Sequence, residues 1–181
     1  MPDVFVRPAT AADIGRMRAI EIAAGQLFLS VDMPEIAADD PPDVGLLNDH
    51  IDAGTAWVAE MESGGRSAVV GYVIASVVDG AAHVDQVSVD PSAERRGIGR
   101  RLLAVVAEWA MGRGISWLTL TTFRDVPWNG PYYARLGFEV MPPSSIGREL
   151  RALVDEETAA GLDPTLRVCM RAPAADLTTP A

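Results

Sequence analysis

The sequence contains no lysine, only one cysteine and only two histidines among its 181 residues. A single cysteine excludes an internal disulfide and any cysteine-based metal centre. His50 and His83 are too few ligands for a dedicated zinc site, so we expect no metal. Cys169 stands in the apolar run LRVCM, which favours a core position over a role as nucleophile.

Long apolar runs are also missing. No stretch of about 18 apolar residues occurs, and the N-terminal segment MPDVFVRPAT lacks the basic region and apolar stretch of a signal peptide. We therefore expect a cytoplasmic protein with no membrane partner. A composition of 49% hydrophobic and 22% charged residues is ordinary for a globular domain, and 181 residues can bury a real core.

Positive charge is scarce in one part of the chain. The formal net charge is -10, and no basic residue stands between Arg18 and Arg66. The acidic residues in that interval are Glu21, Asp32, Glu35, Asp39, Asp40, Asp43, Asp49, Asp52, Glu60 and Glu62. Such a field repels nucleic acid and attracts cations, although a bias toward solubility would produce the same composition.

Periodicity and turn residues predict a domain of mixed strands and helices without internal repeats. The predicted strands are VFVRP, TAWVAEM, SAVVGYVIASVV, AAHVDQVSVD, WLTLTTF, FEVM and LRVCMR. The predicted helices begin at the capping box of Thr10 and Asp13, at Val44, at Ile98, at Tyr132 and near Ser144. Residues 30–42 are expected to form an irregular loop, and residues 172–181, APAADLTTPA, a disordered tail.

The segment ERRGIGRRLL places two glycines at the start of a helix directly after a strand. The first N–H groups of a helix have no intrahelical acceptor and carry partial positive charge, so they bind anions. Gly97 and Gly99 would let a pyrophosphate approach the backbone, with Arg95, Arg96 and Arg100 adding charged hydrogen bonds. A P-loop needs a lysine, and the chain has none. A dinucleotide-binding motif needs a third glycine after Gly99, and this glycine is also missing. The alternative is a plain helix start with solvated arginines.

Four segments in order resemble the GCN5-related N-acetyltransferases, the GNAT family: VRPATAADI, VDQVSVDPSAERRGIGRRLL, WLTLTTF and YYARLGFEV. The resemblance covers Val4 to about Arg171. It implies an α/β (α+β) fold with a mixed, mostly antiparallel central sheet of about seven strands flanked by helices. It also implies a single acetyltransferase domain over residues 1–171, with acetyl-CoA as co-substrate and no metal.

The resemblance further implies which residues bind the cofactor: Val87, Ser88, Val89, Arg95, Arg96, Gly97, Ile98, Gly99, Arg100 and Asn129. Val87 and Val89 would act through main-chain groups, with their side chains in the core. Glu94 departs from the Gln or Arg of the family motif, and a carboxylate near a pyrophosphate is unfavourable. Asn129 would either contact the cofactor or cap the short helix that follows it.

Two residues are candidates for catalysis. The resemblance places Tyr133 where the family often has the acid that protonates the thiolate; the alternative is packing beside Leu136 and Phe138. His83, less readily Asp85, or a chain of water molecules would take the proton of the amine, and the alternative for His83 is a hydrogen-bonded strand residue. The resemblance also implies that the backbone N–H of Val87 stabilises the oxyanion.

We therefore expect an N-acetyltransferase that moves an acetyl group directly to a primary amine of a small, cationic molecule or to a peptide N-terminus. Glu21 and Glu60 would bind a cationic acceptor or lie on a solvated face. A second hypothesis is a catalytically silent acyl-CoA sensor. Nucleic acid is not an expected partner because the arginine cluster is small, and a homodimer stays open.

Overall fold

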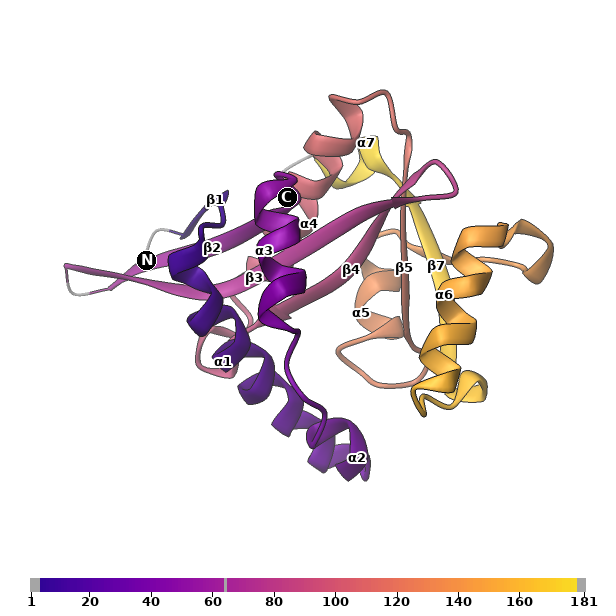
Figure 1. Cartoon of the computed structure of the whole chain (residues 1–181), viewed down its shortest axis with the longest axis horizontal. Helices are drawn as coiled ribbons and strands as arrows, with labels where there is room; N and C mark the ends of the chain where they lie inside the picture. The colour runs from indigo at the N-terminus through magenta and orange to yellow at the C-terminus, as the bar shows by residue number, and fades with distance from the viewer. Residues whose placement is uncertain (1–3, 64, 179–181) are drawn as a thin grey trace. The chain divides into compact units, whose positions relative to one another are not determined.

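The computed structural model describes residues 4–63 and 65–178. Seven strands form one sheet in the order β1-β2-β3-β4-β5-β7-β6 (Figure 1). Their bounds are Val4–Pro8 (β1), Ala56–Ser63 (β2), Arg66–Val78 (β3), Ala81–Val89 (β4), Trp117–Phe123 (β5), Glu139–Val140 (β6) and Arg167–Pro173 (β7). β4 and β5 pair in parallel, whereas β1/β2, β2/β3, β5/β7 and β6/β7 are antiparallel. The predicted mixed sheet of about seven strands is confirmed.

Helices flank this sheet. Their bounds are Ile14–Gly25 (α1), Pro34–Ala37 (α2), Val44–Asp52 (α3), Ile98–Met111 (α4), Gly130–Arg135 (α5), Arg148–Ala159 (α6) and Ala174–Leu177 (α7). Residues 30–42 are more ordered than predicted: the 3₁₀ turn Gln26–Val31 and helix α2 occupy part of this segment. Pro34 stands at the first turn of α2, where its missing N–H leaves no helical bond unmade.

The chain falls into two compact units. Within the described residues, the first runs to Ala75 and resumes over Gln86–Val105, and the second comprises Ser76–Asp85 and the chain from Val106 onward. Strands β3 and β4 and helix α4 therefore contribute residues to both units. Each unit carries different predicted site residues and is described by itself.

In the first unit, α1 and α3 cover one face of β2 and β3 (Figure 1). The largest side chains of this core are fully buried: Met17, Ile20, Leu47, Val58 and Tyr72. The predicted capping box is present, with Asp13 accepting hydrogen bonds from the N–H and hydroxyl of Thr10 at 2.8 and 2.9 Å. Ile22 of α1, by contrast, is exposed.

In the second unit, α6 packs through Leu150 on a small core with Val78, Met141 and Cys169. Asp79, in the turn between β3 and β4, caps the start of α6, because its carboxylate accepts the N–H groups of Glu149 at 3.1 Å and Leu150 at 2.9 Å. Cys169 is buried as predicted, and burial raises the pKa of its thiol.

The predicted disordered tail is wrong for residues 172–178. Strand β7 continues to Pro173, which pairs with Trp117, and the N–H of Ala174 donates to the carbonyl of Ser116 at 2.9 Å. Leu177 in α7 is buried, so one apolar side chain and a strand extension hold this segment in place. Residues 179–181 of the predicted tail lie outside the described residues. Nowhere in the described chain is a helix both long and apolar enough to cross a membrane.

Candidate functional site

A tight turn links β4 to α4 in the first unit. Asp90 directly follows the strand. Its N–H donates to the carbonyl of Val70, and its carboxylate accepts the N–H of Ser92 at 2.9 Å. The chain then reverses at Arg95 and Gly97, whose φ angles are +59° and +71°. Left-handed backbone favours glycine, and an added Cβ at Gly97 would have no atom within 4 Å. The turn is therefore open on the side where the glycine lacks a side chain.

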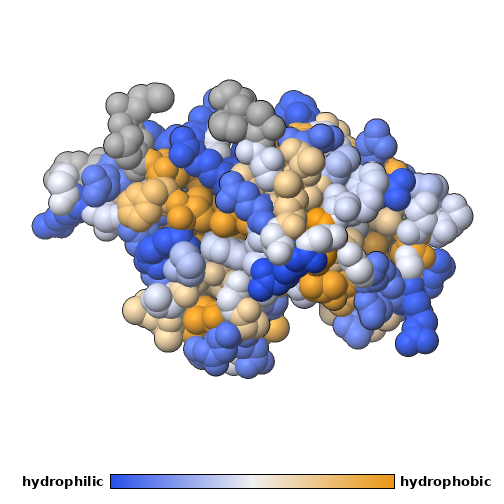
Figure 2. Space-filling model, turned by 90° about the horizontal axis from the view of Figure 1, so that it is seen from above, coloured by the Kyte–Doolittle hydropathy of each residue, from blue (hydrophilic) through white to orange (hydrophobic). Residues whose placement is uncertain are grey.

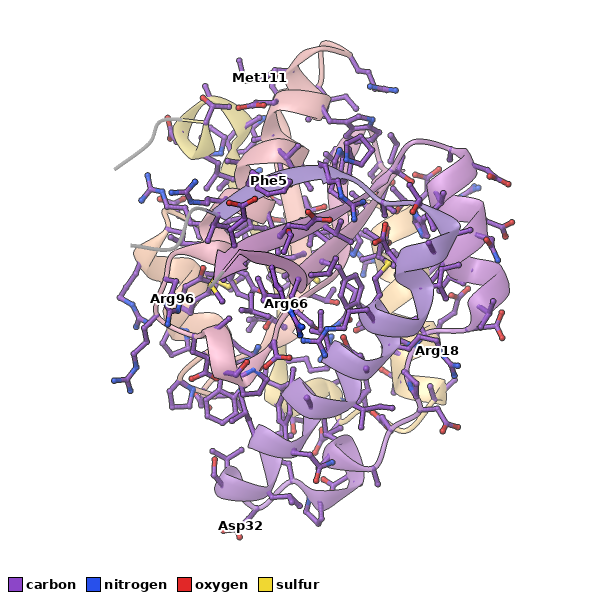
Figure 3. The ribbon with its side chains drawn as sticks, turned by 90° about the vertical axis from the view of Figure 1, so that its left-hand side faces the viewer. Phe5, Arg18, Asp32, Arg66, Arg96 and Met111 are labelled. Atoms are coloured by element: carbon purple, nitrogen blue, oxygen red, sulfur yellow. The ribbon has the colours of Figure 1, made fainter. Side chains whose placement is uncertain are left out.

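Helix α4 begins immediately after this turn. Its first intrahelical bond runs from the N–H of Arg101 to the carbonyl of Gly97 at 3.1 Å, so the preceding N–H groups lie at the positive end of the helix. Arg95 and Arg96 are exposed, and Figure 3 shows Arg96 at the surface of this unit. Ile98 is 2% exposed, so it could reach a cofactor only through its backbone. These groups suit a multiply charged anion such as a pyrophosphate.

Strand β4 leads into this turn with its main chain as the available contact. Val87 and Val89 are half-buried, so the expectation that their side chains lie in the core is wrong. Ser88 is 8% exposed and donates its hydroxyl to Glu21 at 2.6 Å, which commits its side chain inside the protein. A cofactor contact by Ser88 would therefore also run through the backbone.

Glu21 on α1 lies at the centre of a hydrogen-bond network. Its carboxylate accepts bonds from Tyr72 of β3 at 2.7 Å, from Ser88 at 2.6 Å and from Gln86 at 2.9 Å. Glu21 is half-buried, so the alternative of a solvated face does not hold for it. The sequence singled out Glu21, but not Tyr72 or Gln86. The spacing of two between Gln86 and Ser88 was the signal that both share one face of the strand.

The other acidic candidate, Glu60, serves the structure of the first unit. It forms an ion pair with Arg7 and accepts the hydroxyl of Ser67 at 2.9 Å. Because Arg7 already balances the negative charge of Glu60, Glu60 is a weaker candidate than Glu21 for binding a cationic acceptor.

His83 belongs to the second unit and is 3% exposed. Its Nδ1 lies 3.0 Å from the hydroxyl of Thr119 on β5, the residue with which it pairs across the parallel strands. Burial lowers the pKa of His83 to about 4, against a smaller opposite effect of Glu157. The imidazole is therefore neutral at pH 7 and weakly basic. This geometry supports the hydrogen-bonded strand residue, one of the two alternatives that the sequence left open.

Tyr133 lies on α5 of the second unit and is 8% exposed. Its ring meets those of Tyr132 and Phe138 edge to face, with centroids 5.4 and 5.7 Å apart. Gly130 allows α5 to start close to the preceding loop, because a Cβ there would lie 2.3 Å from the carbonyl oxygen of Arg124. The packing alternative for the ring is thus realised, and the role of the hydroxyl stays a prediction.

Asn129 stands at the N-cap position of α5, but its side chain does not cap the helix. The capping prediction is therefore wrong for the side chain; only the backbone carbonyl accepts the N–H of Tyr133 at 3.0 Å. The buried Oδ1 of Asn129 has no donor within the described ranges. An orphaned buried acceptor of this kind fits a ligand N–H, and coenzyme A carries two amide N–H groups in its pantetheine arm.

The second unit also contains a hollow of about 440 Å³ between α6 and strands β5 and β7. Arg167 at its wall hydrogen-bonds Glu157 and Thr121, at 3.1 and 3.0 Å. Apolar lining comes from Val140, Ile146 and neighbouring residues. Across residues 4–63 and 65–178, no group of three or more potential metal ligands is present.

Comparison with known proteins identifies the class to which this fold and turn belong. Residues 22–138 match the Acetyltransferase (GNAT) family, and the chain belongs to this family. The resemblance seen in the sequence motifs is therefore confirmed.

Solved structures share the fold at low identity. An N-acetylglutamate synthase from Neisseria gonorrhoeae, complexed with coenzyme A and N-acetyl-glutamate, has a TM-score of 0.68 at 19% identity over 95% of this chain. This chain spans only 35% of that synthase. A Mycobacterium tuberculosis protein in complex with CoA and NLQ has a TM-score of 0.65 at 19% identity. The match covers 93% of this chain and 98% of the Mycobacterium tuberculosis chain. The ribosomal-protein-S18-alanine N-acetyltransferase from Escherichia coli has a TM-score of 0.62 at 18% identity. The match covers 99% of this chain and 97% of that enzyme.

Proposed function

We propose that this protein is an N-acetyltransferase that moves the acetyl group of acetyl-CoA directly to a primary amine of a small, cationic molecule or of a peptide N-terminus. The observation that carries this proposal is the open glycine turn at Gly97, which joins β4 to the N-terminus of α4 in a GNAT chain. Coenzyme A complexes among the structures of the same fold support the cofactor.

The chain's own groups suit the cofactor. The N-terminus of α4 with Arg95, Arg96 and Arg100 would hold the pyrophosphate. The main chain of Val87 to Val89 would pair with the pantetheine arm. Acetyl-CoA itself supplies the activated thioester.

The remaining tasks of the transfer fall to other groups. As the amine attacks, the carbonyl oxygen gains negative charge, for which the N–H of Val87 is our candidate donor. The departing thiolate needs a proton. A phenol can donate a proton to a thiolate of comparable basicity, so Tyr133 is our candidate for the acid. A histidine with a pKa near 4 is a poor acceptor for the proton of an amine, so His83 is the weaker part of the predicted pair.

An amine acceptor is supported by two lines of observation. The names of two proteins with this fold describe acetylation of an amino group, on glutamate in one and on an alanine of a ribosomal protein in the other. The net charge of -10 favours a cationic acceptor over an anionic one.

The test is release of coenzyme A from acetyl-CoA, followed with a thiol reagent across polyamines, aminoglycosides, arylalkylamines, amino acids and basic peptides. We expect turnover with at least one class, and Tyr133→Phe should lower kcat by roughly 10²-fold with little change in acetyl-CoA affinity. Tyr132→Phe is the matched control, because it removes a neighbouring half-buried phenol. Equal kcat in Tyr133→Phe and wild type would remove Tyr133 from the mechanism.

The sensor hypothesis stays as the second candidate because of Glu94. Its exposed carboxylate stands one residue before the turn, where the family motif has Gln or Arg. A sensor would bind acetyl-CoA and release no coenzyme A with any amine. Measured turnover that depends on Tyr133 excludes it.

A further inference from the structure

The carboxylate of Glu21 is held by three neutral donors and still has room for a fourth. Oε2 accepts the hydroxyls of Tyr72 and Ser88, while Oε1 accepts, among the residues that the structure describes, only the amide of Gln86. A carboxylate oxygen accepts two hydrogen bonds in its plane, so Oε1 keeps one acceptor position. Tyr72 is fully buried and Ser88 is 8% exposed, whereas Glu21 is half-buried and can be reached from solvent.

The network also fixes the position of this carboxylate relative to one segment of β4, because two of its donors, Gln86 and Ser88, belong to that strand. Gln86 and Ser88 point to the same face of the strand and flank Val87. Val87 is the residue whose N–H is our candidate for the oxyanion. Glu21 is therefore tied to the segment of β4 where the acetyl group would lie, and all four members of the network belong to the first unit.

The negative charge of Glu21 is not neutralised inside this network. Burial, followed by the charge of Glu21, raises the pKa of Tyr72, which keeps the phenol protonated as a donor. Among the ion pairs of the described chain, none involves Glu21. A half-buried carboxylate with neutral partners attracts a group that is positive or becomes positive.

We propose that Glu21 is a catalytic residue that binds the reacting amine of the acceptor and takes its proton during acetyl transfer. The inference rests on the proposed function and names the base that His83 does not supply. The neutral amine donates an N–H to Oε1 and its lone pair forms the new bond to the acetyl carbon. The nitrogen gains positive charge as it attacks, so its attraction to the carboxylate is strongest in the transition state.

The proton balance is then complete. One N–H proton passes from the nitrogen to Glu21, the C–S bond breaks, and the amide product forms. The thiolate takes a separate proton, for which Tyr133 is the candidate donor. Protonated Glu21 then gives its proton to water and the Tyr133 phenolate takes one from water, so both groups are restored before the next turnover.

The decisive experiment compares Glu21→Gln with wild type on the best amine from the panel. We expect kcat to fall by roughly 10²- to 10³-fold, with acetyl-CoA affinity within about twofold of wild type. Glu60→Gln is the matched control, since Glu60 is another half-buried, hydrogen-bonded glutamate of the same unit. We expect Glu60→Gln to keep the kcat of the wild type. Loss of the ion pair with Arg7 should lower its thermal stability.

A conservative variant guards against loss of folding. Glu21→Asp keeps the charge but withdraws it by one methylene, so we expect a fall in kcat of about tenfold. Wild-type turnover together with near-normal kcat in Glu21→Gln, or in Glu21→Asp if the first variant does not fold, would overturn this inference alone. Wild-type silence across the whole amine panel would instead overturn the proposed function and this inference with it.

Discussion

Arg7 joins three segments of the first unit through its guanidinium group. It donates two hydrogen bonds of 2.8 Å to the carboxylate of Asp13 and one of 2.7 Å to Glu60. Asp13 in turn receives the N–H and hydroxyl of Thr10. The hydrogen bonds from Arg7, followed by those from Thr10, outweigh burial and lower the pKa of Asp13 to about 2. The start of α1 is therefore tied to β1 and β2 by an ionised carboxylate.

The stability of the protein should depend on this carboxylate in acid. A pKa lowered to about 2 means that the contribution is complete above the unfolded pKa of about 4 and is lost as the pH falls toward 2. We expect Asp13→Asn to lower the free energy of unfolding by about 1–2 kcal/mol at pH 6, and by less at pH 3. Urea denaturation at both pH values measures this. Asp52→Asn, an exposed change, is the control; an equal loss for Asp13→Asn at both pH values would contradict the assignment.

At the scale of the element, the turn before α4 combines a strained backbone with an open surface. Arg95 and Gly97 both have positive φ, and the first turn of the helix follows directly. Burial of Ile98 and Leu102 holds the helix against the sheet, which leaves the N–H groups of its first turn facing the open side. The conformation of this turn therefore depends on the two residues with positive φ, Arg95 and Gly97.

We therefore expect Gly97→Ala to weaken acetyl-CoA binding by about tenfold, because an L residue at φ +71° shifts the turn. Isothermal titration calorimetry measures the affinity. Gly54→Ala is the matched control: it has φ +69°, belongs to the same unit and also has no atom within 4 Å of a Cβ. Both variants should lose about 1 kcal/mol of stability. Equal affinities in the two variants would show that the turn does not bind the cofactor.

At the scale of the whole molecule, the dominant property is its net charge of -10. On the face drawn in Figure 2, hydrophilic residues are interspersed with smaller hydrophobic patches. The exposed large apolar side chains, Phe5 and Trp117 among them, are scattered along the chain. The long-range field therefore comes from the excess of carboxylates, and it acts on any charged acceptor that approaches.

This field predicts a salt effect on acceptor capture. At saturating acetyl-CoA, kcat/KM for a polyamine should fall about three- to tenfold when the ionic strength rises from about 0.02 to about 0.3 M. An amino-acid acceptor of zero net charge should change little under the same conditions, which provides the control. Identical salt dependence for both acceptors would mean that the negative charge serves solubility only.

Sequence patterns predicted the elements well where the signal is local. The helical spacing of Ile98, Leu102 and Val106 matches their burial in α4, and the capping box of Thr10 and Asp13 forms as expected. The patterns failed for residues 172–178, because the strand pairing with Trp117 and the burial of Leu177 depend on partners far away in sequence.

The candidate site was predictable only in part, for the same reason. The glycine turn is visible as a motif, since neighbouring residues create it. The network of Glu21 is not, because its partners Tyr72 and Ser88 lie 51 and 67 residues away along the chain. Asn129 occupies the expected N-cap position, yet the direction of its side chain follows from the surrounding loop.

The sequence by itself determined the family, through four motifs in order, and also most strands and helices and the glycine turn, because each motif and element depends on residues a few positions apart. The tertiary structure alone decided which titratable groups are buried and what they contact. It buried His83, which makes the imidazole a weak base, and it surrounded Glu21 with neutral donors beside Val87. Desolvation and hydrogen bonding act between segments that only folding brings together, and these two effects set the chemistry of a side chain.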